Sequence, residues 1–179
     1  MLKKRLGTEA IEKEGLWNSV LKLKSYYKIS STLIIPEGCR WIGRCAFYNC
    51  WYLKRVVIPG SVKTIGRSAF EGCAGLRKIE ISNGCVWIVR EAFYGCRELK
   101  EVIIPKGVEG IGDEAFRGCC KLEKVEIPES VKRIGEGAFY ECISATIILK
   151  KSKRKFKGIG WSAFYYCKSV EYAEKETRD

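Results

Sequence analysis

The sequence predicts a repeat solenoid, a right-handed coil of about six units that carries a parallel β-sheet, and three regularities predict it. An Ala-Phe pair recurs every 23 residues, at 46–47, 69–70, 92–93, 115–116 and 138–139, and again after 25 residues at 163–164. A cysteine follows each phenylalanine by three positions, and most units also contain Ile-Pro and Ile-Gly at matching positions. Repeats of this length form supersecondary units that stack to share one core.

Residues 53–73 show the physical basis of one unit. Segment 53–58 has the apolar pattern of a short strand with one buried face, and a proline ends it because proline donates no ladder hydrogen bond. Val62 and Ile65 point inward from a second short strand, and the pair 69–70 fills the interior from a half-turn helical piece. Since one unit has no partner for its apolar side, neighbouring units must stack at the strand spacing of ~4.8 Å.

These units resemble the BspA-like leucine-rich repeats, whose pattern is roughly L-x-x-V-x-I-P-x-x-V-x-x-I-G-x-x-A-F-x-x-C. The match covers residues 32–172, with Ile-Pro, Ile-Gly, Ala-Phe and Cys in register. The resemblance implies a leucine-rich-repeat solenoid with a parallel β-sheet on its concave face, and short second strands and half-turn helical pieces opposite. It also implies protein–protein or surface binding, and many relatives are secreted or displayed on bacterial and protist surfaces.

Both ends of the chain lack the repeat. Residues 1–31 are predicted to form a helical N-terminal cap, because the open end of a parallel sheet needs cover. One helical face would carry Ile11, Trp17, Val20, Leu21 and Tyr27. Residues 173–179 are predicted to be a polar tail. The domain organisation is therefore a cap, a solenoid over 32–172 and a tail.

Catalytic and cofactor-binding motifs are absent from the sequence. Without histidine, the chain lacks the commonest general base and metal ligand. It contains no nucleophile elbow, phosphate-binding loop, dinucleotide fingerprint or C-x2-C pair. The glycines recur with the repeat, so turns account for them. We expect no enzyme activity, no cofactor and no bound metal.

Ten cysteines raise the alternatives of disulfides or structural thiols. Six belong to the repeat column, and Cys39 and Cys85 replace a core valine, whereas Cys45 and Cys120 are irregular. Stacked cysteines have parallel Cβ vectors, which favours free, buried thiols, with Cys120 the most reactive. The basic N-terminus is followed by acidic residues and not by the apolar stretch of a signal peptide. We therefore expect a reducing, cytoplasmic location.

The net charge of +12 is distributed unevenly. Residues 1–78 contain 15 Lys and Arg against 5 Asp and Glu, residues 79–147 are slightly acidic, and residues 148–179 are basic again. The last repeat has two extra residues, and the insertion coincides with a basic loop of Lys150, Lys151, Lys153, Arg154, Lys155 and Lys157. We expect the insertion to be extruded from the solenoid as a protruding loop. One interpretation is a contact for phosphates or for an acidic protein surface, and the other is a solvated loop with no partner.

The outward strand positions are the candidate partner-binding face. They are Arg55, Val57, Lys78, Glu80, Glu101, Ile103, Lys124 and Glu126, and the aromatic pair Trp51 and Tyr52 precedes the first of them. Mixed charge with aliphatic residues is typical of a protein-binding sheet, because a nucleic-acid binder favours an unbroken basic stripe with stacking aromatics. We expect a non-catalytic protein-binding module and no membrane contact. The alternative is a basic binder of nucleic acid or of a nucleoprotein enzyme, acting as an inhibitor.

Two aromatic columns recur with the repeat. Trp41 and Trp87 share one position, and another position holds Tyr48, Tyr94, Tyr140 and Tyr165. The columns either brace neighbouring coils or form part of an interface, and the sequence leaves both interpretations open.

Overall fold

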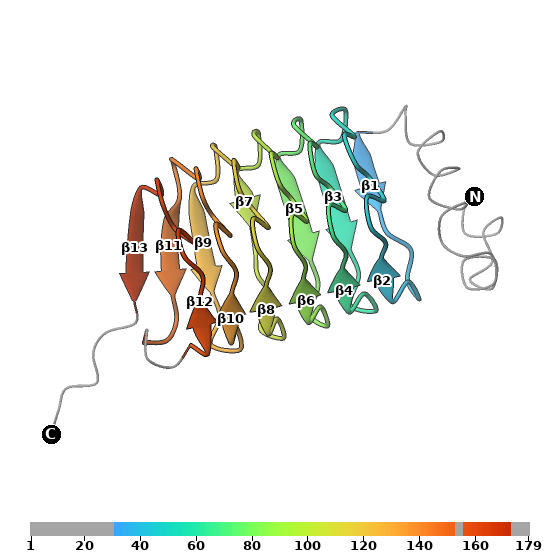
Figure 1. Cartoon of the computed structure of the whole chain (residues 1–179). Helices are drawn as coiled ribbons and strands as arrows, with labels where there is room; N and C mark the ends of the chain where they lie inside the picture. Colours follow the sequence, from blue (N-terminus) through green and yellow to red (C-terminus); the bar gives the residue numbers. More distant parts are fainter. Residues whose placement is uncertain (1–30, 153–155, 173–179) are drawn as a thin grey trace, which may run out of the picture.

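The computed structural model describes residues 31–152 and 156–172, which form a solenoid of stacked coils (Figure 1). Each of six coils contributes one strand to each of two parallel sheets, and one further strand extends the first sheet at the C-terminal end. The predicted solenoid is therefore confirmed. The predicted helical cap and the polar tail lie outside the described residues, apart from Ser31.

The longer-stranded sheet, called sheet A, has seven parallel strands. In spatial order they are β1 (Thr32–Ile34), β3 (Arg55–Ile58), β5 (Lys78–Ile81), β7 (Glu101–Val102), β9 (Lys124–Ile127), β11 (Thr146–Leu149) and β13 (Ser169–Tyr172). The other, sheet B, has six parallel strands of two residues each. These are β2 (Trp41–Ile42), β4 (Thr64–Ile65), β6 (Trp87–Ile88), β8 (Gly110–Ile111), β10 (Arg133–Ile134) and β12 (Gly158–Ile159).

The expected half-turn helical pieces are series of turns, and no helix occurs among the described residues. These turns form a third backbone ladder, in which each phenylalanine N–H donates to the alanine carbonyl of the next coil. The Phe93 N–H reaches the Ala115 oxygen at 2.8 Å, and the other coils repeat this bond. These bonds between coils alternate with bonds along the chain to the third residue back, such as that from the Ala92 N–H to the Val89 oxygen at 3.2 Å. The turns therefore lack the continuous i→i−4 bonds of an α-helix.

A phenylalanine stack runs through the core. Ring centroids of consecutive coils lie 5.1–5.3 Å apart from Phe47 to Phe139, with interplanar angles of 18° or less. The last step, to the partly buried Phe164, widens to 6.0 Å. Phe70, Phe93 and Phe116 are completely buried. The 23-residue recurrence thus produces one continuous aromatic column.

The six repeat cysteines form a second column beside the phenylalanines. From the second repeat onward, each thiol lies 3.1–3.3 Å from a phenylalanine carbonyl oxygen of the preceding coil, as Cys96 does with Phe70. All ten cysteines are free. The repeat column therefore acts as a set of small buried groups that bond between coils.

Left-handed backbone recurs at two positions in each turn. The first position has φ between 53° and 59° and is held by Cys45, Ser68, Glu91, Glu114, Gly137 and Ser162. The irregular Cys45 therefore occupies a strained turn position. The second position has φ between 54° and 71° and is glycine in three coils but Tyr166 in the last. A bulky residue is uncommon there because its Cβ crowds the backbone.

The last coil differs from the others in two places. One residue is missing before β11, since Thr146 pairs with Lys124 across 22 positions and not 23. Eight residues then separate Leu149 from Gly158, whereas five separate Ile127 from Arg133. The two-residue difference seen in the sequence is thus the net result of a three-residue insertion and a one-residue deletion.

Candidate functional site

The outer face of sheet A consists of two rows of side chains. Strand residues alternate between buried and outward positions, so all eight predicted outward residues lie on this face. Strand pairing aligns the first row as Thr32, Arg55, Lys78, Glu101, Lys124, Thr146 and Ser169. The second row is Ile34, Val57, Glu80, Ile103, Glu126, Ile148 and Glu171, in which Ile103 lies just after β7 and is placed by its 23-residue spacing from Glu80 and Glu126.

The charges in these rows neutralise one another. Arg55 donates two hydrogen bonds to Glu80, at 2.8 and 3.1 Å. Lys78 lies 3.6 Å from Glu80 and 3.5 Å from Glu101. The Arg55 hydrogen bonds hold the pKa of the exposed Glu80 carboxyl below its ordinary value. Exposed ion pairs contribute little stability, so the network mainly orients charged groups on the face.

A second charge cluster joins this face to the beginning of the last loop. Glu126 accepts from Lys124 at 2.8 Å and from Lys150 at 3.0 Å. Hydrogen bonds from these two lysines lower the pKa of Glu126. Lys150, predicted to belong to the protruding basic loop, therefore lies on sheet A.

The ladder of sheet A is interrupted at β7. Four residue pairs join β3 to β5 and β9 to β11, but β7 and β9 share only the pair Glu101–Lys124. The strand ends at Val102, although the chain continues toward Ile103 and Pro105 with the same apolar pattern as its neighbours. The hydrogen-bond ladder between β7 and β9 is therefore missing after Val102, where the chain of β7 runs into its following loop.

A cleft of about 1070 Å³ lies at this interruption. Ile103 is 60% exposed there, whereas Ile104 is buried. The lining combines apolar groups with charges of both signs, including Glu101, Ile103, Pro105, Lys124, Glu126 and Lys150. The structure therefore brings four of the ten predicted partner-binding residues together around one cavity.

Trp51 and Tyr52 lie in the turn before β3, and their rings meet edge to face at 6.1 Å. Tyr52 packs against the core, and its hydroxyl lies 3.7 Å from the Cys50 sulfur. Burial, with a smaller contribution from Cys50, raises the pKa of Tyr52 to about 12. Packing therefore accounts for Tyr52, whereas Trp51 is 70% exposed.

The predicted basic loop is not one exposed patch. Lys150 pairs with Glu126 on sheet A, whereas Lys157 lines a groove beside sheet B. Lys151 is buried, which contradicts its predicted place on a protruding loop. Its ammonium donates to the Glu129 and Val131 carbonyls and lies 4.4 Å from the Phe156 ring centroid. Lys153, Arg154 and Lys155 lie outside the described residues.

The burial of Lys151 leads to a stability prediction. Lys151→Met is expected to lower the free energy of unfolding by about 1.5–3 kcal/mol, because bonds from a charged donor to two carbonyls are lost. The matched control Lys150→Met removes an exposed charge and is expected to cost about 1 kcal/mol or less. Urea unfolding of both variants measures the difference. Equal midpoints would show that Lys151 does not anchor the loop.

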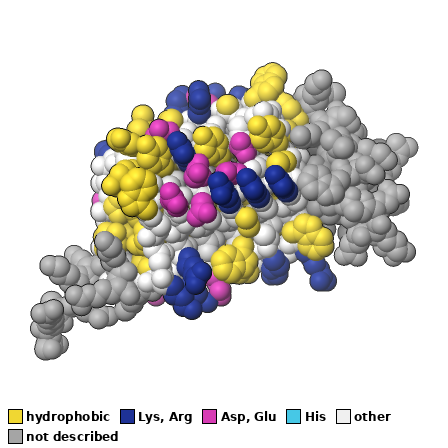
Figure 2. Space-filling view, viewed as in Figure 1, with side chains coloured by type: hydrophobic (Ala, Val, Ile, Leu, Met, Phe, Trp, Pro, Cys, Tyr) yellow, Lys and Arg dark blue, Asp and Glu magenta, His cyan; other side chains and the backbone are white. Residues whose placement is uncertain are grey.

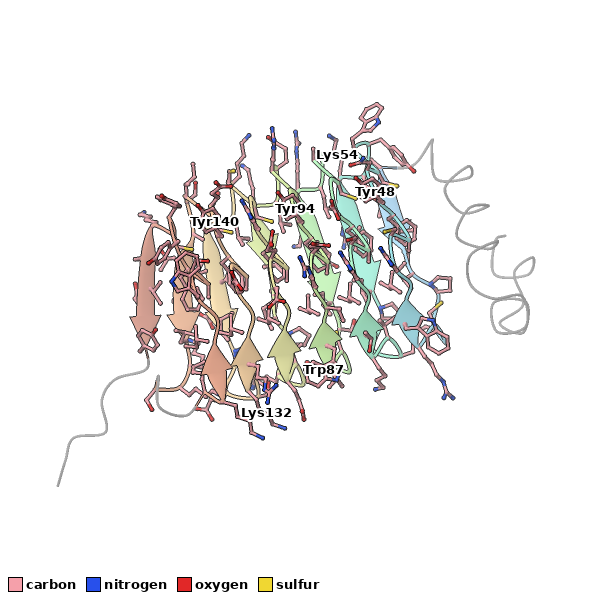
Figure 3. All side chains as sticks on the ribbon, viewed as in Figure 1. Tyr48, Lys54, Trp87, Tyr94, Lys132 and Tyr140 are labelled. Carbon is pink, nitrogen blue, oxygen red and sulfur yellow. The ribbon has the colours of Figure 1, made fainter. Side chains whose placement is uncertain are left out.

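The tyrosine column braces neighbouring coils at Tyr94 and Tyr140, both labelled in Figure 3. The Arg117 guanidinium lies between them, 5.8 Å from the Tyr94 ring centroid and 4.7 Å from that of Tyr140. Arg117 also pairs with Glu114 at 3.1 Å. The bracing interpretation therefore holds here. In the last coil, Tyr165 and Tyr166 are exposed.

Several exposed residues were missed by the sequence reasoning. Trp161 is 72% exposed and contacts Tyr165 at 5.7 Å, and Ile34 continues the aliphatic row of sheet A. Arg44, Arg67 and Arg90 recur 23 residues apart and are all exposed. The same periodicity that located the core could have found these arginines.

Within residues 31–152 and 156–172, no group of three Cys, Asp or Glu side chains is placed to hold a metal ion. Over the same residues, no helix is long and apolar enough to cross a membrane.

Similar solved structures are bacterial leucine-rich-repeat proteins. A leucine-rich cell surface protein from Faecalibacterium prausnitzii is 33% identical (TM-score 0.63), and the match covers 83% of this chain and 33% of that one. The leucine-rich repeat protein TpLRR from T. pallidum is 30% identical (TM-score 0.64), and the match covers 79% of this chain and 72% of that one. The pneumococcal vaccine antigen PcpA is 25% identical (TM-score 0.63), and the match covers 72% of this chain and 32% of that one.

This chain therefore spans about a third of the F. prausnitzii protein and of PcpA. No curated protein matches it. The model of the BspA type leucine-rich repeat region, with six copies, matches residues 23–146 and 87–177. The chain belongs to the BspA type leucine-rich repeat family.

Proposed function

We propose that this chain is a non-catalytic module that binds a protein partner through the outer face of sheet A. Leucine-rich repeats are a typical scaffold for protein interactions. Each repeat adds one strand to a continuous sheet, so a partner meets regularly spaced side chains on a rigid surface.

The cleft between β7 and β9 is the observation that carries this proposal. It combines an exposed apolar residue, Ile103, with a rim of both charges. An apolar anchor surrounded by polar groups is the usual composition of a protein interface. Because Glu126 pairs with Lys124 and Lys150, the rim does not present the unbroken positive charge that a nucleic acid requires.

Site-specific photocrosslinking in the native host tests the proposal. A photoreactive phenylalanine analogue at position 103 is expected to trap one discrete protein. The same analogue at exposed Ile143, which lies in the turn before β11, is the matched control. A ladder of unrelated adducts at both positions, or no adduct at 103, would contradict the proposed binding face.

We also propose that the chain works in a reducing, cytoplasmic compartment, although the F. prausnitzii relative is a cell surface protein. The support is the thiol column, in which buried cysteines bond to carbonyls of neighbouring coils. Burial raises the pKa of Cys85 to about 11 and that of Cys167 to about 12, so these thiols stay protonated near neutral pH.

Thiol counting checks this second proposal. Protein from the native host, denatured without reductant, is expected to yield all ten free thiols. In the folded protein, alkylation followed by mass spectrometry is expected to label the partly exposed Cys120 first and the buried Cys96 last. Recovery of four thiols or fewer would indicate disulfides and an oxidising compartment.

A further inference from the structure

The half of sheet B nearer the N-terminus carries a tryptophan row between two basic rows. Strand pairing aligns the outward residues Trp41, Thr64 and Trp87, and the two tryptophans are 54% and 45% exposed. Two strand spacings separate them, about 9.6 Å. The basic residues are Arg40 and Lys63 just before β2 and β4, and Arg44, Arg67 and Arg90 beyond β2, β4 and β6, all exposed.

The positive charge of this face is only partly neutralised. Glu91 is shared by Arg67 and Arg90, at 3.1 and 3.0 Å. Burial acts to raise the pKa of Glu91, but hydrogen bonds from Arg90, Arg67 and Ser68 outweigh it and keep the pKa low. Among the described residues, no carboxylate pairs with Arg40, Arg44 or Lys63.

The charge pattern changes along the same rows toward the C-terminus. Asp113 and Glu136 follow Arg90 at the same repeat position, and Lys132 pairs with Glu109 at 2.8 Å. Figure 2 shows a line of Lys and Arg side chains on the side of the N-terminus that continues into Asp and Glu. In the tryptophan row, Gly110 leaves room for the Trp87 ring, because a Cβ atom on residue 110 would lie only 2.2 Å from the nearest ring carbon of Trp87. The basic aromatic face of the first three coils therefore gives way to mixed charge in the fourth and fifth. Arg133, Lys157 and Trp161 bring basic and aromatic groups back to these rows nearer the C-terminus.

We propose that this face, formed by Arg40, Trp41, Arg44, Lys63, Arg67, Trp87 and Arg90, binds single-stranded nucleic acid. Unstacked bases lie on the two indole rings, and phosphates meet the flanking rows of Arg and Lys. Proteins that bind single strands combine a positive track for the backbone with aromatic rings on which bases stack. The arginine row supplies one guanidinium per strand spacing, which suits a regularly spaced polyanion.

The aromatic row favours a single strand over other anions. A duplex keeps its bases stacked inside, so the indole rings would gain nothing from it. An acidic peptide or a sulfated polysaccharide satisfies the guanidinium groups but has no planar bases for Trp41 and Trp87. The site is separate from the proposed protein-binding face, so either function can fail without the other.

Fluorescence anisotropy with labelled dT20 and rU20 tests the proposal on the full chain. We expect a Kd in the micromolar range at about 100 mM salt. Trp41→Ala is expected to weaken binding about tenfold or more, because a stacked base is lost. The double variant Arg44→Gln/Arg67→Gln is expected to reduce the slope of log K against log salt by about 1.4, which corresponds to two phosphate contacts.

The double variant Arg77→Gln/Lys100→Gln is the matched control. It also removes two exposed positive charges, but from the residues that precede β5 and β7, away from the tryptophan row. It is expected to change affinity less than threefold, as is Ile103→Asp on sheet A. Trp41 is exposed, so its loss should leave the thermal unfolding midpoint unchanged, which a circular dichroism melt verifies.

Four results would overturn the proposal. They are the absence of oligonucleotide binding at 50 mM salt, equal affinity for a duplex of the same length, equal losses in the two double variants, and binding that Trp41→Ala leaves intact. If heparin or poly-glutamate binds as tightly as dT20 and the tryptophan variant does not weaken it, the face is a general polyanion site and not a nucleic-acid site.

Discussion

Replacing Phe93 by alanine is expected to lower the free energy of unfolding by about 3–5 kcal/mol. The Phe93 ring is completely buried and stacks on Phe70 at 5.3 Å and on Phe116 at 5.2 Å. The backbone between the coils is held by its own ladder, so the coils cannot collapse into the space left by the ring. Urea unfolding followed by circular dichroism measures the loss.

The matched control is Phe164→Ala at the end of the stack. Phe164 is only partly buried and has one stacking neighbour, Phe139, at 6.0 Å. We expect this variant to cost about half as much as Phe93→Ala, or less, because less apolar surface returns to water. Equal losses at both positions would mean that the phenylalanine column does not hold the coils together as one continuous core.

The fold could be predicted in detail because one physical constraint repeats six times. A residue that points into the stack at one coil points inward at every coil, so 23-residue spacing revealed Ala69, Phe70, Cys73 and their equivalents. The turn geometry was harder to predict, because a half-turn helix and a left-handed turn bury the same side chains. In the structure, the hydrogen bonds between successive turns and the residues with positive φ show that left-handed turns are formed.

The irregular parts could not be predicted from periodicity. The segment after Glu101 has the same apolar alternation as the one after Lys124, yet β7 ends at Val102. The insertion in the last repeat predicts an extruded loop that includes Lys151, because extra residues in a solenoid usually leave the stack. The burial of Lys151 depends on the Glu129 and Val131 carbonyls, which belong to the preceding coil. Both features depend on contacts between coils and not on the repeat pattern.

The candidate binding face was partly predictable for the same reason. Alternation along the strands identified Arg55, Glu80 and Ile103 as outward residues, and the structure agrees. It did not identify which outward residues surround a cavity, because the cleft exists only where the β7–β9 ladder opens. Arg44, Arg67 and Arg90 share the 23-residue spacing and could have been predicted as a row, but a net charge summed over successive segments does not reveal it.

The Ile103→Asp variant is expected to reduce affinity for the protein trapped at position 103 by about 30-fold or more. Central apolar anchors at interfaces contribute about 2 kcal/mol or more each, and an aspartate at the cleft would add a fourth carboxylate to Glu101, Glu126 and Glu129. Because Ile103 is 60% exposed, stability should fall by about 0.5 kcal/mol or less. Titration calorimetry with the purified partner measures the affinity.

Two further variants separate the cleft from the charged rows of the same face. Arg55→Gln breaks the ion pair with Glu80, away from the cleft, and is expected to alter the association rate and its salt dependence while changing affinity less than about fivefold.

Ile148→Asp introduces the same charge in the same row but outside the cleft lining, so it distinguishes the cavity from general electrostatic repulsion. If Ile148→Asp weakens binding as much as Ile103→Asp, the partner senses the charge of the whole sheet and the cleft is not the anchor. If neither variant weakens binding, the partner does not dock on sheet A, because an apolar anchor cannot be replaced by a hydrated carboxylate without loss of affinity.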